Sequence, residues 1–145
     1  MITVGGIGIY AVGHCVNRSL GLEVVNLMGP SMQPVIEEGD IALTEKRSVM
    51  KNTLKKGDIV IATSPVTPDR IICKRITGFE DEEMPPHQNK TIFSYSHIPP
   101  GHVWLEGDNT SASTDSRTYG PVPYGLIQGR VFYRLFPANR RGKIT

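Results

Sequence analysis

The stretch Ile71–Gly78, IICKRITG, gives the first indication of the fold expected of this chain. Its β-branched residues favour a strand, and side chains alternate between the two faces of a strand. Ile72, Lys74 and Ile76 therefore share one face, and Arg75 lies on the other. If the strand belongs to a packed sheet, one cation points where isoleucine points. An unpaired buried charge is costly, so a lysine at this position calls for a specific reason.

Short apolar runs on both sides of this stretch predict further strands. The sequence contains 15 Gly and 11 Pro, which favour turns and short strands over helical bundles. Asp58–Thr63, DIVIAT, is separated from Arg70 by a turn and is the expected hairpin partner. We therefore expect an all-β, mainly antiparallel fold. The expected strands are Glu23–Met28, Ile41–Thr44, Asp58–Thr63, Arg70–Phe79, Thr91–Tyr95, His102–Glu106 and Leu126–Phe136.

The composition limits the classes of function that are expected of this chain. A chain of 145 residues with 39% hydrophobic content fits one domain, and a net charge of +2 does not suggest a nucleic-acid partner. The two cysteines form no disulfide framework. The four histidines have no metal spacing and no phosphate-binding glycine loop is present, so we expect no metal and no cofactor.

We divide the chain into an apolar N-terminal segment (1–22), a main domain (23–137) with a small polar insertion (80–100), and a basic tail (138–145). Met1–Val16 carries no Lys, Arg, Asp or Glu, but a full membrane span needs about 20 apolar residues. The segment is a short membrane anchor, a signal-peptide-like core or a buried part of the domain. The basic tail is interpreted as a solvated end.

Ser31 lies in GPSMQPVI, Gly29–Ile36, directly after an expected strand. Pro30 and Pro34 restrict the backbone around it, so Ser31 sits in a stiffened turn. Alone, this pattern is also that of an ordinary turn. A lysine in apolar surroundings loses its proton more easily, and a neutral Lys74 amine is a usable general base for a serine. Taken alone, the pattern favours a Lys74 whose ammonium reaches water at the sheet edge.

The long loop Gly107–Pro121, GDNTSASTDSRTYGP, is the third candidate. Asp115 and Arg117 have opposite charges and are close in sequence, so we expect an ion pair. Ser113 lies two residues before Asp115. A loop of this length without secondary structure favours a functional role over a plain polar surface.

Together, and in this order, these motifs resemble the type I signal peptidase family of serine–lysine proteases. The motifs are PSMQP around Ser31, GDIV at Gly57–Val60, KRITG at Lys74–Gly78 and GDNTSASTDSR at Gly107–Arg117. Within the family, the match is best to the mitochondrial inner membrane branch. The resemblance extends from Gly29 to Pro137 and implies a signal-peptidase-like β-barrel or sandwich with long loops.

The resemblance also implies roles for individual residues. Ser31 is the expected nucleophile and Lys74 its general base. Ser113 would orient the lysine amine, with Asp115 and Arg117 supporting its loop. Met32 would shape the substrate pocket, and the oxyanion donor would be the Ser31 N–H. Many bacterial relatives carry a serine where this chain has Gly29, so a second, side-chain oxyanion donor is not expected here.

The function implied is a membrane-associated serine endopeptidase. It removes N-terminal sorting peptides from precursor proteins at the mitochondrial inner membrane, facing the intermembrane space, with a related second subunit as partner. Two alternatives stay open. One is a self-cleaving serine–lysine regulatory protease, and the other is a non-catalytic peptide-binding subunit.

Overall fold

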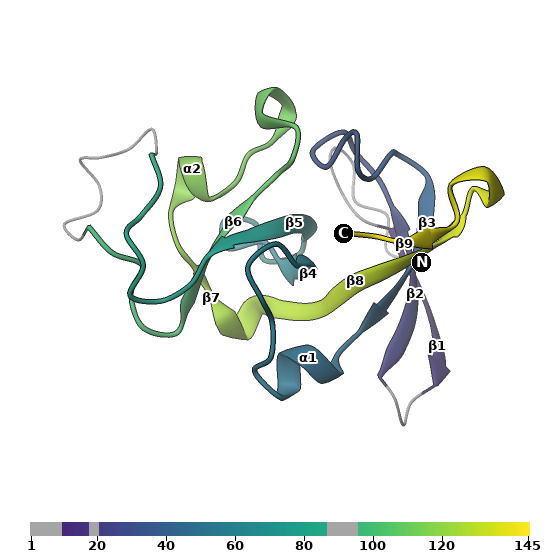
Figure 1. Ribbon diagram of the computed structural model, residues 1–145, viewed down its shortest axis with the longest axis horizontal. Helices are drawn as coiled ribbons and strands as arrows, with labels where there is room; N and C mark the ends of the chain where they lie inside the picture. Colours follow the sequence, from purple (N-terminus) through teal and green to yellow (C-terminus); the bar gives the residue numbers. More distant parts are fainter. Residues whose placement is uncertain (1–9, 18–20, 87–95) are drawn as a thin grey trace.

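The structure is a computed structural model that describes residues 10–17, 21–86 and 96–145. Most of these residues lie in strands or in the turns between them (Figure 1). The strands are β1 (Tyr10–Asn17), β2 (Leu22–Leu27), β3 (Asp40–Glu45), β4 (Ile59–Thr63), β5 (Ile71–Gly78), β6 (His102–Glu106), β7 (Val122–Pro123), β8 (Ile127–Phe136) and β9 (Gly142–Lys143). The helices are α1 (Arg47–Met50), α2 (Ser116–Tyr119) and three single 3₁₀ turns, η1 (Thr110–Ala112), η2 (Tyr124–Leu126) and η3 (Ala138–Arg140).

All nine strands belong to one antiparallel sheet that curves into a half-barrel. The strand order is β1-β2-β3-β8-β4-β5-β6-β7, and β9 pairs with β8. The long strand β8 therefore joins the β1–β3 half to the β4–β7 half, and Figure 1 shows it crossing between them. The all-β, mainly antiparallel fold expected from the sequence is confirmed.

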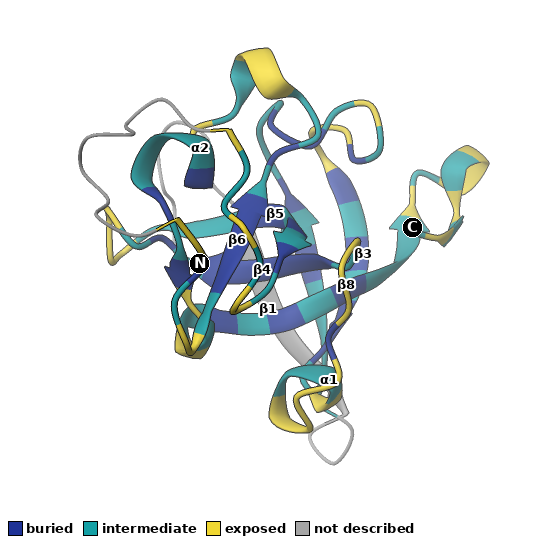
Figure 2. Cartoon of the chain, turned by 60° about the vertical axis from the view of Figure 1, so that its left-hand side comes forward, coloured by how far each residue is buried: buried dark blue, intermediate teal, exposed yellow. Residues whose placement is uncertain are grey.

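Two clusters of buried apolar residues pack against the curved sheet, and Figure 2 shows buried residues in dark blue along its strands. The alternation of β4 and β5 sends neighbouring residues to different clusters. We call these cluster A and cluster B. Cluster A contains Val25, Leu27, Met32, Ile36, Ala42, Ile59, Ile61, Cys73 and Val131. Cluster B contains Leu54, Val60, Ala62, Ile76, Val103, Leu105, Val122 and Ile127.

The predicted strands agree with the observed ones to within two residues wherever the structure describes them. β4 and β5 form the expected hairpin, with Val60 opposite Lys74. The expected strand Thr91–Tyr95 falls outside the described residues. Residues Tyr10–Asn17 of the apolar N-terminal segment form β1, which pairs with β2. Within the described ranges, no helix is long and apolar enough to cross a membrane.

The basic tail (138–145) is mostly exposed, but Arg140 and Ile144 are partly buried, so the interpretation of the tail as a solvated end is wrong for Arg140. Its guanidinium is within 3.0 Å of Glu37 and 3.2 Å of Asp40. β9 extends the sheet beside β8, and Ile144 packs against cluster A. The sequence pattern missed β9 because two residues carry no readable alternation.

Candidate active site

Lys74 is buried in the middle of β5. The residue is 2% exposed, and its neighbour on the same face of the strand, Ile76, is fully buried in cluster B. Burial lowers the pKa of the Lys74 amine, because desolvation disfavours the charged form. Cys73 and Asp115 act against this shift of the Lys74 pKa, while the charge of Arg117 adds to it. The surroundings therefore favour a neutral amine more than water does.

Ser31 lies in the turn between β2 and β3, which we call the nucleophile turn (Gly29–Asp40) after the role that the sequence resemblance implies for Ser31. The turn opens with Gly29 at a φ of 91°, a conformation that favours glycine. It is closed by hydrogen bonds from the Gln33 N–H to the Pro30 carbonyl and from the Ile36 N–H to the Met32 carbonyl. Ser31 is 6% exposed, so its position is fixed by the packing of the turn.

One small pocket brings Ser31 and Lys74 together with Gly29 and Met32. It lies beside the first half of β5, because β6 pairs only with the second half, from Arg75 onward. Within the described part of the chain, no hydrogen bond joins the Lys74 amine to the Ser31 hydroxyl. The remaining lining residues are Leu27, Met28, Ile36, Ile71, Ile72 and Cys73.

Cys73 also lines the pocket but is not a second nucleophile. Burial raises the pKa of its thiol to about 12. A thiol with such a pKa is almost entirely protonated at neutral pH, and the thiolate is the reactive form. Cys73 therefore acts as an apolar wall of the pocket and as a member of cluster A.

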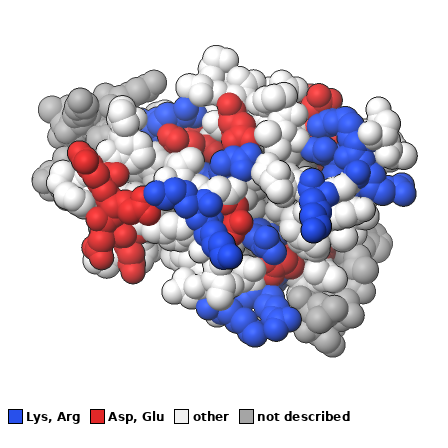
Figure 3. All heavy atoms as spheres, viewed as in Figure 1, with Lys and Arg blue, Asp and Glu red and all other residues white. Residues whose placement is uncertain are grey.

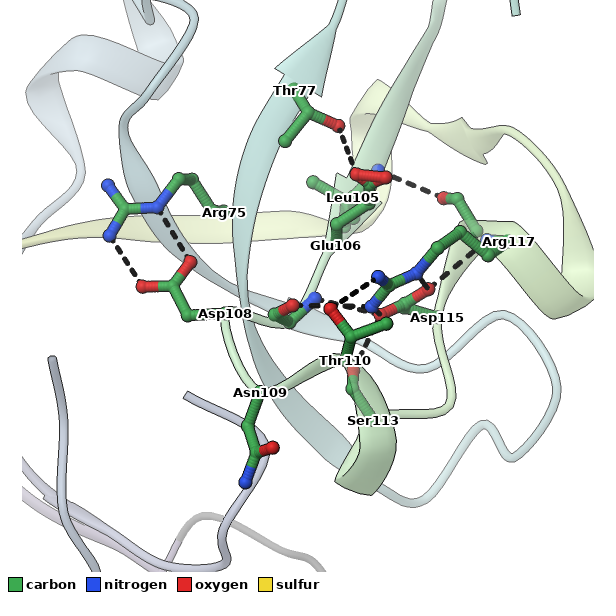
Figure 4. Close-up of polar contacts among 12 residues, drawn as sticks. Arg75, Thr77, Leu105, Glu106, Asp108, Asn109, Thr110, Ser113, Asp115 and Arg117 are labelled. Carbon is green, nitrogen blue, oxygen red and sulfur yellow. Dashed lines mark hydrogen bonds and ion pairs between the residues drawn. The ribbon is translucent and has the colours of Figure 1, made fainter. Parts of the chain in front are cut away.

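Asp115 organises the loop that carries Ser113. Its carboxylate is fully buried and accepts hydrogen bonds from the Gly107 N–H at 2.8 Å, the Ser113 hydroxyl at 2.6 Å and the Arg117 guanidinium at 2.6 Å (Figure 4). Burial alone would raise the pKa of Asp115. The donors from Arg117, Gly107 and Ser113 outweigh it and lower the pKa, so the carboxylate is charged. The Asp115–Arg117 ion pair expected from the sequence is present.

Ser113 is thus placed by Asp115 rather than by Lys74. Its hydroxyl donates to Asp115, which leaves the oxygen lone pairs free to accept a bond. Gly107 lies between this serine and the nucleophile turn. A Cβ at Gly107 would come 2.1 Å from Ser113 Oγ and 2.6 Å from the Ser31 carbonyl oxygen. Only glycine fits at a point where the two segments approach so closely.

Asn109 joins the same loop to the nucleophile turn. Its backbone N–H donates to the Ser31 carbonyl at 2.9 Å, and its side-chain amide donates to the Pro30 carbonyl at 3.1 Å. In Figure 4, Asn109 points away from the Asp115–Arg117 cluster. The loop therefore holds the backbone of Ser31 directly, and the sequence offered no signal for this contact beyond the GDN motif.

Arg75 and Asp108 form a second ion pair at the edge of the site. The Arg75 guanidinium donates through two nitrogens to the two Asp108 oxygens, at 2.8 and 2.7 Å, and a third nitrogen reaches the Gly57 carbonyl. Arg75 thus points away from Lys74, as the alternation of the strand predicts, and ties β5 to the start of the loop. Sequence reasoning missed Asp108 because Gly-Asp is a frequent turn dipeptide.

Comparisons with known proteins identify a family and several relatives of this chain. Residues 2–84 and 79–136 match the family described as signal peptidase, peptidase S26. Mitochondrial inner membrane protease subunit 1 of Homo sapiens is 46% identical over 132 residues, covering 90% of this chain and 79% of the relative. Subunit 2 of the protease from Schizosaccharomyces pombe is 36% identical over 126 residues, covering 85% and 69%. A crystal structure of a signal peptidase I from Enterococcus faecalis covers 53% of this chain and 95% of that chain, with 19% identity and a TM-score of 0.44.

The family match covers far more than half of the chain. The chain therefore belongs to the signal peptidase family, peptidase S26. The resemblance noted in the sequence is confirmed at the level of the family, and its match to the mitochondrial inner membrane branch agrees with the names of the relatives.

Proposed function

We propose that this signal peptidase is a serine endopeptidase in which Ser31 is the nucleophile and Lys74 the general base. The observation that carries the proposal is the burial of Lys74 in one pocket with Ser31. A charged ammonium would be costly there, whereas a neutral amine can accept the proton that activates a serine. A lysine on the surface would offer no such chemistry.

The proposed reaction has two steps. Ser31 Oγ bonds to the scissile carbonyl carbon while its proton moves to Lys74. The peptide C–N bond then breaks, the proton passes to the leaving amine, and an acyl-enzyme ester remains. Water then attacks the ester carbonyl carbon while Lys74 accepts its proton, the bond between this carbon and Ser31 Oγ breaks, and the proton passes from Lys74 to Ser31 Oγ as the carboxyl product leaves. The Ser31 N–H is the proposed oxyanion donor.

The loop Gly107–Arg117 supports this reaction by position. Asp115 and Arg117 hold Ser113, whose free lone pairs are proposed to accept a hydrogen bond from the Lys74 amine and orient it. Met32 and Gly29 are proposed to form the wall of the substrate pocket beside Ser31. An extended substrate chain is proposed to lie along the first half of β5, which β6 leaves open.

The proposed substrates are precursor proteins that carry N-terminal sorting peptides. The proposed place is the mitochondrial inner membrane, with the site facing the intermembrane space. The names of the relatives support this, since they are called mitochondrial inner membrane protease subunits. A complex with a related subunit 2 is proposed because such subunits are also similar to this chain.

Cleavage of a precursor segment by the full chain tests the proposal, with product read by mass spectrometry. Ser31→Ala, Lys74→Ala and Lys74→Arg are each expected to abolish cleavage, since arginine does not deprotonate. Lys51→Ala, at an exposed lysine, is the matched control and should cleave like the wild type. The far-ultraviolet circular dichroism should stay unchanged in all four.

The outcomes separate the candidate functions. Cleavage by Ser31→Ala or Lys74→Arg at the wild-type rate would refute the dyad. Scission of the chain itself in place of the precursor segment would indicate the self-cleaving alternative. A wild type that binds the segment and never cuts it, alone or with subunit 2, would indicate a peptide-binding subunit.

A further inference from the structure

The far end of the nucleophile turn is held by the last part of the chain. Arg134 Nε donates to one oxygen of Asp40 at 3.0 Å, and Arg140 Nη1 donates to the other at 3.2 Å. A second nitrogen of Arg134 donates to the Val35 carbonyl. Asp40 also accepts from the Glu37 N–H at 3.0 Å. Two guanidinium groups thus bind the segment from Val35 to Asp40.

These contacts lie inside the protein. The Asp40 side chain is 3% exposed, against 11% for Arg134 and 25% for Arg140. Arg134 also donates to the Arg140 carbonyl, so the two arginines are coupled. When one partner of a buried ion pair is removed, the other is left uncompensated. Ion pairs with this degree of burial therefore contribute far more to local order than a surface pair does.

The same C-terminal segment also packs against the pocket wall. The Ile144 N–H donates to the Phe132 carbonyl, and its side chain contacts cluster A. Cluster A contains Met32 and Ile36, which line the pocket beside Ser31. In Figure 3, Lys and Arg side chains gather over the side of the molecule where β9 and η3 lie.

The nucleophile turn needs such support because it contains no helix or strand between β2 and β3. Its first residues are held by Asn109, which binds the Pro30 and Ser31 carbonyls. Its last residues are held by Arg134 and Arg140. Ser31 belongs to the first attachment, and the second fixes the other end of the same turn, so a loosened second attachment is expected to let the hydroxyl move relative to Lys74.

We propose that Arg140 is a positioning residue for Ser31, acting through Asp40 and the end of the nucleophile turn. This inference rests on the proposed function. Arg140 does not touch the pocket, so its effect is on the geometry of attack. A displacement of the reacting group by about 1 Å costs about 10²-fold in rate, and a partial loosening of the turn costs less. We expect Arg140→Ala to lower kcat about tenfold or more, with a smaller change in KM.

Arg141 provides a matched control. Its guanidinium donates to the Leu135 carbonyl and is exposed, so it makes no contact with the nucleophile turn. Arg141→Ala removes the same charge from the same segment and should keep the wild-type kcat. Arg140→Lys restores a cation near Glu37 and Asp40 and should recover part of the loss. A kcat for Arg140→Ala equal to that of Arg141→Ala would overturn the proposal.

Hydrogen–deuterium exchange provides a readout that does not depend on proteolysis. The Ile36 and Gly39 N–H groups donate to the Met32 and Leu27 carbonyls and report the closure of the turn. In the full chain, both amides should exchange faster in Arg140→Ala than in Arg141→Ala, while the amides of β4 keep their rates. Faster exchange with an unchanged kcat would refute the positioning role and leave Arg140 a structural residue.

The two readouts also separate this inference from the proposed function. If the wild type cleaves no substrate, the proposed function fails. Exchange at Ile36 and Gly39 then still decides whether Arg140 fixes the turn. Equal exchange in Arg140→Ala and Arg141→Ala would refute the attachment itself, whatever the activity.

Discussion

Lys74 and Asp115 are both buried ionisable residues near Ser31, but their surroundings favour the neutral form of the lysine and the charged form of the aspartate. Lys74 is enclosed by apolar side chains and makes no hydrogen bond within the described residues, so burial lowers its pKa. Asp115 is just as buried but accepts bonds from Gly107, Ser113 and Arg117, so its pKa is lowered too. For a lysine, a lower pKa means a neutral group. For an aspartate, it means a charged one.

This difference shows that burial alone does not set the protonation state. The partners around each group also matter, because acceptors or anions keep an ammonium charged, whereas donors or cations keep a carboxylate charged. Within the described residues the Lys74 amine has no hydrogen-bond partner, as its proposed role as a base requires, whereas Asp115 accepts several hydrogen bonds that fix it in place. Gly107 and Asn109 lie where the loop that carries Asp115 meets the turn that carries Ser31.

Lys74→Met removes the buried amine and has the largest expected effect on cleavage. Cleavage should fall by up to about 10⁴-fold, because the base is lost. Stability should rise at neutral pH, because methionine carries no amine to desolvate. The folded state holds the Lys74 pKa below its unfolded value, so the wild type gains stability as pH rises between the two. The advantage of Lys74→Met in urea unfolding should therefore shrink at alkaline pH. A mutant less stable than the wild type across the whole range would contradict the burial of an unpaired amine.

Gly107→Ala disrupts the close approach of the loop that carries Ser113 to the nucleophile turn. The added methyl would overlap Ser113 Oγ and the Ser31 carbonyl, so the loop and the nucleophile turn must separate. We expect cleavage to fall about 10²-fold, since a shift of about 1 Å suffices for this. Gly125→Ala is the control, because nothing lies within 4 Å of a Cβ there. Steady-state kinetics measure both, and equal rates for the two mutants would show that the close approach is not needed.

Asp115→Asn tests the hydrogen-bond network around Asp115 and should mainly lower the free energy of unfolding. It leaves Arg117 without its charged partner and replaces an acceptor of several bonds by an amide. Loss of one partner of a buried pair costs about 3 kcal/mol. The deficit should be smaller at acidic pH, because the wild-type carboxylate stabilises the fold only above its depressed pKa. Asp69→Asn, at an exposed position, is the control in urea unfolding. A loss equal to that of the control would mean that the network around Asp115 contributes nothing.

Much of this arrangement was predictable from the sequence, because it depends on local pattern. The alternation in IICKRITG placed Lys74 on the face of Ile76, and the opposite charges of Asp115 and Arg117 indicated their ion pair. The main strands followed from short β-branched runs between turn residues. In each case, the residues that interact lie within a few positions of one another.

The missed contacts join residues that are far apart in the chain. Arg75 binds Asp108, and Arg140 binds Asp40 about a hundred positions away. Each has many partners of opposite charge in the sequence, so composition cannot choose among them. The choice follows from the strand order, which places β8 beside β3 and the C-terminal segment beside the nucleophile turn.

The proposed mechanism requires a neutral Lys74 amine, and the Lys74 side chain reports its own protonation directly. The chemical shift of the Lys74 ¹⁵Nζ can be followed against pH in lysine-labelled protein, with the signal assigned by its loss in Lys74→Arg. We expect the titration midpoint of the Lys74 amine to lie clearly below 10.5, the ordinary lysine value, because burial lowers its pKa. A Lys74 midpoint at or above that ordinary value would contradict the proposal that this amine serves as a base.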